Sequence, residues 1–210
     1  MPTPTPPETT LPPELVDLAK TVLLGGAGLV VAYLKKLIDE YKAGLLKKRQ
    51  SDPLYLADKQ LRLDQFTSRA VIEADADHTC VFKFHNGEHY AGGDSILKMT
   101  MASEDVSSPS FARHKEDSKN INTNGHPTLM NGVGKQAMFW LHAGRCEDYD
   151  TNQMLARRGH ASSVVLLARG KGGQWLGLLM LSWHKLQDES TVSAADLVAL
   201  QTELGFLMNP

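Results

Sequence analysis

The stretch that decides the fold covers residues 161–183 and reads ASSVVLLA, RGKGG, QWLGLLMLSW. Its two apolar segments, Ala161–Ala168 and Gln174–Trp183, have the length and the aliphatic content of buried β-strands. The segment between them, Arg169–Gly173, is rich in glycine, and glycines of this kind close tight turns between antiparallel strands. The sequence therefore predicts a buried β-hairpin.

A helix is predicted after the hairpin, over Ala194–Leu207, because leucines recur there at helical spacing. Either hydroxyl residue, Thr191 or Ser193, could cap its first turn. The buried stripe is expected to contain Leu197, Leu200, Leu204 and Leu207.

Before the hairpin the pattern predicts a helix over Leu56–Ala74, a strand over His78–His85 that stops at the Asn86-Gly87 turn, and a strand over Ile96–Met101. The signals weaken between residues 103 and 157, where Ala137–His142 is the one strongly apolar segment. A binding site could be built in this middle region. The apolar positions of the first helix are Leu56, Leu61, Leu63, Phe66, Ala70 and Val71.

From residue 56 to residue 210 this order of elements resembles the GAF family. In GAF domains a glycine precedes apolar residues in the second hairpin strand, and a small or acidic residue stands near the start of the last helix. Gly177 and Asp196 match those places. The resemblance implies an α/β (α+β) fold, with a central antiparallel sheet, helices on one side, and a ligand pocket on the other side under the variable middle region.

The motifs of the ligand-loaded and enzymatic members of that family are missing. The chain has neither a cysteine suitably placed to hold a bilin nor the N-K-x-n-F-x3-D-E pattern of cyclic-nucleotide binders. Cys146 is the only cysteine of the middle region. Gly170–Gly173 joins two strands instead of opening a helix, so it is no phosphate loop. No hydrolase elbow, P-loop or kinase signature is present. We therefore expect no cofactor and no enzymatic activity; a disulfide between Cys80 and Cys146 stays open.

Two groups of residues are candidates for ligand binding. The first is the predicted turn with His85, Asn86, Glu88, His89 and Tyr90, whose polar side chains could converge on an organic or anionic ligand. Its spacing differs from a zinc-binding H-E-x-x-H helix, and an ordinary polar turn is the alternative.

The second group is Arg157, Arg158 and His160, which directly precede the hairpin. They could meet the same pocket across the sheet, and the alternative is a solvated start of the strand.

The N-terminal residues divide by composition. Residues 1–14 are proline-rich and are expected to be an extended or disordered lead. Residues 15–34 are mostly apolar, and their length of 20 residues approaches what a membrane-spanning helix needs. The glycines within them equally suit a soluble helix buried in a homo-oligomer. A signal peptide is disfavoured, because the lead is acidic instead of basic.

A basic segment follows the apolar one. It has six basic residues against Asp39 and Glu40, an excess of four positive charges. Such an excess beside a membrane helix would place the C-terminal domain in the cytoplasm, whereas the alternative is a solvated helix face. The basic residues are Lys35, Lys36, Lys42, Lys47, Lys48 and Arg49. The predicted organisation is a lead (1–14), an anchor and basic stalk (15–52), and a GAF-like domain (53–210).

These features predict a membrane-tethered, non-enzymatic sensory or binding module. With a net charge of −2 and 22% charged residues, no nucleic-acid partner is expected. The competing prediction is a structural protein whose apolar helix drives assembly; the F-H-N-G turn also resembles small anchored proteins of bacteriophage. A pocket with a polar lining would favour the sensory or binding module. A pocket filled by Phe84, Met99 or Trp140 would favour the structural protein.

Overall fold

The computed structural model describes the backbone of residues 31–42, 44, 52–89 and 95–209, with the side chains of all but 86–89, 95 and 96. The chain divides into two units after Asp52. In the first unit residues 31–42 are helical, and every side chain of that helix is exposed. In the described part of the chain, no helix is both long and apolar enough to cross a membrane. The lead and residues 15–30 of the predicted anchor lie outside the described residues.

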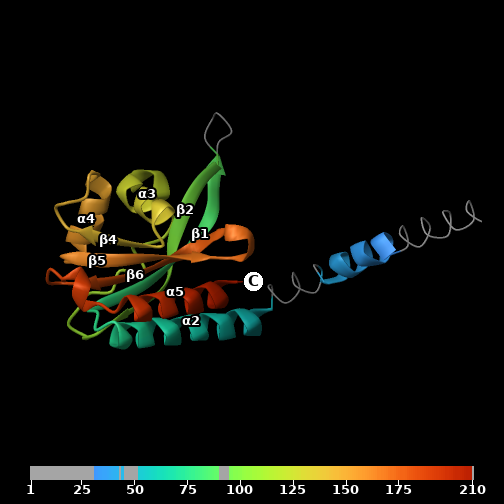
Figure 1. Cartoon of the computed structure of the whole chain (residues 1–210), viewed down its shortest axis with the longest axis horizontal. Coiled ribbons are helices and arrows are strands. Elements are labelled where there is room, and N and C mark those ends of the chain that lie inside the picture. Colours follow the sequence, from blue (N-terminus) through green and yellow to red (C-terminus); the bar gives the residue numbers. More distant parts are fainter. Residues whose placement is uncertain (1–30, 43, 45–51, 90–94, 210) are drawn as a thin grey trace, which may run out of the picture. The chain divides into compact units, whose positions relative to one another are not determined.

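The second unit is built on a six-stranded antiparallel sheet with the strand order β3-β2-β1-β6-β5-β4 (Figure 1). The predicted hairpin is confirmed as β5 and β6, and its turn contains Gly172 and Gly173 with positive φ angles of 73° and 80°. The strands are β1 (His78–His89), β2 (Ser95–Val106), β3 (Ile121–Asn122), β4 (Met138–His142), β5 (Ser162–Arg169) and β6 (Trp175–Trp183).

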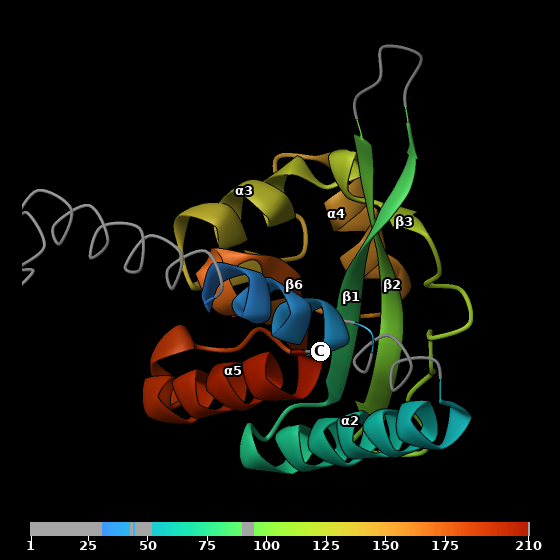
Figure 2. The same cartoon turned by 90° about the vertical axis from the view of Figure 1, so that its right-hand side faces the viewer.

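Helices cover both faces of the sheet. Helices α2 (Pro53–Glu73) and α5 (Ala194–Met208) lie side by side on one face, while α3 (Pro127–Lys135) and α4 (Tyr149–Arg157) lie on the other (Figures 1 and 2). The second pair comes from the middle region, where the sequence signals are weak because these helices are short and depend on packing against the sheet.

The two apolar layers follow from the alternation of side chains along β5. Val164 and Leu166 pack toward α2 and α5, whereas Val165 and Leu167 pack toward α3 and α4. Both faces of the strand are therefore buried, which explains why its sequence is apolar without interruption.

The stripe of α5 is confirmed for three of its four leucines. Ser193 caps the helix by accepting a hydrogen bond from the Asp196 backbone N–H. Met208 fills the last buried position, and Leu207 is half-buried.

In α2 the apolar stripe is shorter than predicted. Leu56 and Leu61 are 49% and 56% exposed. Leu61 lies two positions before the buried Leu63, which turns it about 200° around the helix to the outer face. Leu56 belongs to the first turn of the helix.

The prediction that β1 stops at Asn86-Gly87 is wrong, since the strand continues to His89. Asn86 pairs with Leu97 and His89 pairs with Ser95, so that two residues of β1 stand opposite one residue of β2. This is a β-bulge, and it absorbs the turn-forming Asn-Gly pair without ending the strand.

Candidate functional site

A cleft with a volume of about 560 Å³ opens on the face of the sheet that α3 and α4 cover. One wall is the segment between β2 and β3, and α4 forms the other. Both walls carry polar side chains, and Ile121 and Met154 are apolar members of the lining. The polar lining includes His114, Asp117, Ser118, Asp150, Gln153 and Arg158.

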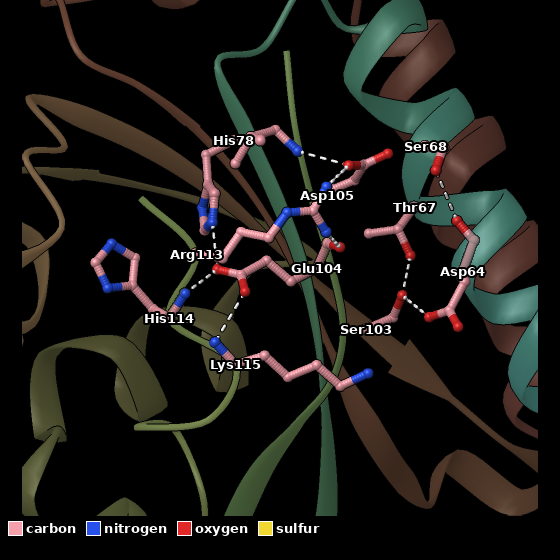
Figure 3. A network of polar contacts seen from close by, with 11 residues as sticks. Asp64, Thr67, Ser68, His78, Ser103, Glu104, Asp105, Arg113, His114 and Lys115 are labelled. Atoms are coloured by element: carbon pink, nitrogen blue, oxygen red, sulfur yellow. Dashed lines mark hydrogen bonds and ion pairs between the residues drawn. The ribbon is translucent and has the colours of Figure 1, made fainter. Parts of the chain in front are cut away.

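The carboxylate of Glu104, at the end of β2, holds the first wall in place (Figure 3). It accepts hydrogen bonds from the backbone N–H groups of His114 (2.7 Å) and Lys115 (2.8 Å), and from Nε2 of His78 (2.7 Å). Burial by itself raises the pKa of Glu104, but these hydrogen bonds outweigh it and lower the pKa to about 2. The segment is therefore fixed to the sheet by a permanently charged side chain at neutral pH.

The preceding residue, Ser103, ties the same strand to the opposite helix. Its hydroxyl donates to Asp64 and shares a hydrogen bond with Thr67, and both partners belong to α2 (Figure 3). Because neighbouring side chains of a strand point to opposite faces, Ser103 and Glu104 attach β2 to both layers.

Arg158 is the cation at the end of α4. The residue is buried, with 8% of its surface exposed. Nη2 donates to Oγ of Ser118 at 2.7 Å, and the guanidinium lies 5.5 Å from the centre of the Phe82 ring. Nη1 is buried and has no hydrogen-bond partner among the described residues. The alternative of a solvated strand start is therefore wrong for Arg158.

The alternative of a solvated strand start is also wrong for His160, which is 2% exposed. The chain reverses at Gly159, whose φ is +69°, and this reversal folds His160 under the end of α4. Its ring lies 4.8 Å from the His78 ring and 5.7 Å from the His184 ring.

Three histidines near Arg158 have lowered pKa values and are neutral. Burial, followed by the neighbouring His78 and Arg158, lowers the pKa of His160 to about 2. Burial and then Arg158 also lower the pKa of His114, and burial lowers that of His126. At neutral pH these imidazoles offer hydrogen bonds and no charge, so the positive charge at this end of the cleft belongs to Arg158 and its exposed neighbour Arg157.

Comparison with known proteins identifies the fold of the domain. No protein-family model and no curated protein matches the chain. The cyanobacteriochrome receptor PixJ superposes with a TM-score of 0.53 at 12% identity, covering 73% of this chain and 96% of that one. The domain has a GAF fold.

Two further structures agree with this GAF fold. The GAF domain of a two-component sensor histidine kinase from Bacillus halodurans gives a TM-score of 0.51 at 16% identity, over 70% of this chain and 90% of that one. A GAF domain region from Geobacter sulfurreducens PCA gives 0.50 at 13% identity, over 78% and 95%. Identities this low establish the fold alone, and the comparisons give no support to the bacteriophage resemblance.

Within this fold, His85 of the predicted turn lies away from the cleft. His85 shares a face of β1 with Val81, which packs toward α2 and α5, and its Nε2 lies 2.9 Å from Oγ1 of Thr100. Arg158 lies on the other face, beside Phe82. The structure therefore brings Arg158 and His160 together and separates both from His85.

The remaining members of the predicted turn have no described side chains. Asn86, Glu88 and His89 belong to β1 by their backbone, and Tyr90 lies outside the described residues. Their role in ligand binding stays a prediction. In the ranges that the structure describes, no group of three or more His, Cys, Asp or Glu residues is arranged to hold a metal ion.

Sequence reasoning missed Glu104, His114 and Ser118, which build the cleft wall. The charged run Arg113–Lys119 was the available signal, but it does not reveal which strand the run packs against. The three apolar residues proposed to fill a pocket do not line this cleft: Met99 and Phe84 belong to the layer under α3 and α4, and Trp140 packs on the opposite face.

Proposed function

We propose that this chain is a membrane-tethered, non-enzymatic sensory module whose GAF domain binds a small ligand in the cleft between α4 and the segment before β3. The observation that carries the proposal is the cleft itself: its loop wall is fixed by Glu104, and Arg158 at one end has an unused donor. Preformed clefts with a few fixed polar groups are the usual form of ligand sites. The PixJ receptor and the histidine kinase show that GAF domains occur in sensory proteins.

The described thiols favour binding over chemistry. Cys80 is fully buried, and burial raises the pKa of its thiol to about 12. Burial also raises the pKa of the half-buried Cys146. Both are free cysteines, and a thiol with a raised pKa is a poor nucleophile.

A ligand screen tests the binding site. Thermal unfolding of the full chain would be followed with a panel of anionic, neutral and cationic metabolites. Gln153→Trp should abolish any stabilisation, because a large ring at this position occupies the cleft. Ala156→Trp is the matched control, since Ala156 is exposed on the same helix and does not line the cleft. Equal stabilisation of both variants would place binding elsewhere and contradict the proposal.

The tether rests on residues 15–34 and on the exposed helix that follows. Within residues 31–42 the large apolar side chains are 42–69% exposed. Such a group of exposed apolar side chains is typical of a surface that a membrane or another protein covers. The side chains are those of Val31, Tyr33, Leu34, Leu37, Ile38 and Tyr41. A carbonate wash of membranes should retain the full chain and release a chain that begins at Pro53.

One observation favours the competing structural function. Val31, Leu34, Ile38 and Tyr41 follow the 3-4-3 spacing of a coiled coil, with β-branched residues at alternate positions. If the carbonate wash releases the full chain as well, and sedimentation shows it to be an oligomer that the shortened chain does not form, assembly is the function of the helix.

A further inference from the structure

We infer that the cleft recognises its ligand through an anionic group, a carboxylate or a phosphate, that binds the guanidinium of Arg158. This inference rests on the proposed ligand-binding function and names the chemical class of the ligand. The juxtaposition that carries it is a buried arginine with one unpaired nitrogen at the end of a polar cleft.

The first step is the missing counter-ion. A guanidinium carries five N–H donors and is always charged, so a buried one is normally paired with a carboxylate. Here the described residues supply one hydroxyl, Ser118, and the face of one ring, Phe82. The buried carboxylate of the cluster, Glu104, is already engaged by His78 and by two backbone N–H groups.

The second step is the cost of this arrangement. Burying a charge without a partner is unfavourable, and a buried donor without an acceptor adds to that cost. Proteins retain such groups where the missing partner is a ligand or an ordered water. Arg158 lines the cleft, whereas a purely structural arginine would be expected to meet an acid of its own chain.

The third step is the distribution of charge along α4. Arg158 follows the last residue of the helix, and Asp150 lies in its first turn. They are eight positions apart, or about 12 Å along the helix axis. Both line the cleft. A ligand whose anionic group meets Arg158 can therefore present a hydrogen-bond donor to Asp150 at the other end.

The fourth step is the choice of anion. Arginine forms paired hydrogen bonds with both carboxylates and phosphates, so the shared chemistry is a planar or tetrahedral oxyanion. Sodium phosphate and sodium succinate separate the two sources. Glucose and spermidine represent neutral and cationic ligands, and sodium chloride at equal ionic strength corrects for screening.

The experiment measures thermal unfolding and binding of the full chain with these five solutes. We expect phosphate or succinate to raise the unfolding temperature above the chloride control. Arg158→Met should weaken that binding by about 10- to 100-fold, the value of hydrogen bonds to a charged group. Arg145→Met is the control and should bind normally, because Arg145 is an exposed arginine that does not line the cleft.

The variant also carries its own test of folding. Without any ligand, Arg158→Met should unfold at a temperature equal to or above that of the wild type, because it removes a buried charge that lacks a counter-ion. Arg158→Lys provides a second variant that keeps the charge and loses the paired donors, and it should bind the anion more weakly than the wild type.

Three outcomes would overturn the inference. Anion binding that survives Arg158→Met would mean that Nη1 meets only an internal water. Stabilisation by glucose or spermidine without stabilisation by phosphate or succinate would leave the binding function standing and remove the anion. If no compound of this set or of the metabolite panel binds, the proposed function fails together with the inference.

Discussion

Nε2 of His78 lies 2.7 Å from Oε1 of Glu104, and both side chains are 1% exposed. The two residues come from neighbouring strands, and the same carboxylate binds the backbone of residues 114 and 115. One buried charge thus joins the sheet to the wall of the cleft.

Glu104→Gln should therefore destabilise the domain by about 1–3 kcal/mol, because a neutral amide cannot accept all three hydrogen bonds and directs its own N–H groups at donors. Urea unfolding at pH 7 measures the change. Glu203→Gln serves as the control, since Glu203 pairs with Arg69 at a half-exposed position and should lose no more than about 1 kcal/mol. Equal losses in the two variants would show that Glu104 is no anchor.

Acid should release this anchor. The pKa of Glu104 is about 2 in the folded domain and has a usual value of 4.5, so its contribution to stability is complete above pH 4.5. It is lost as the pH falls from 4.5 toward 2. The protection factor of the Lys115 amide in hydrogen exchange, which corrects for the slower intrinsic exchange in acid, should fall between pH 5 and pH 3. A protection factor that stays constant over this range speaks against the mechanism.

His160 predicts a second pH dependence at a higher range. Its pKa is lowered from 6.5 to about 2, so the unfolded chain takes up a proton near pH 6.5 that the folded chain does not. Stability should fall as the pH drops below 6.5, by up to about 1.4 kcal/mol per pH unit for this group. In His160→Leu the fall should be shallower. The Cε1 proton of His160 provides the direct check, because a titration near pH 6.5 in its NMR signal would refute the prediction.

The two cysteines should differ in their reaction with a thiol reagent. Cys146 is half-buried and Cys80 is fully buried, and burial raises the pKa of both. The folded chain should react slowly at one thiol, and Cys146→Ser should react only after urea is added. Rapid labelling of Cys146→Ser without urea would contradict this prediction and show that the apolar layer around Cys80 opens readily.

Gly177→Ala should be strongly destabilising, by about 1–3 kcal/mol or more. A Cβ atom at this position would lie 2.0 Å from the backbone oxygen of Phe82 and 2.4 Å from the end of Met208. Gly44→Ala is the control, because a Cβ atom there meets nothing within 4 Å. Thermal unfolding compares them, and similar unfolding temperatures would contradict the close approach of β1 to β6.

The sequence by itself determined the β5–β6 hairpin, α5 and most of α2. These elements have strong local signals: an uninterrupted apolar run, a glycine-rich turn, and leucines at helical spacing. Gly177 was singled out by the resemblance to the GAF family, and the close approach of β1 explains why a glycine stands there.

Only the tertiary structure decided the site. Whether Arg158 is solvated or buried depends on Ser118 and Phe82, which lie 40 and 76 residues away in the chain, and no local pattern reports such contacts. The alternation of side chains along β1 likewise places His85 on one face of the sheet and Phe82, which contacts Arg158, on the other. Both His85 and Arg158 were candidate ligand-binding residues. Burial and hydrogen-bond partners are properties of segments that meet in space, and for this reason the cleft emerged from the fold.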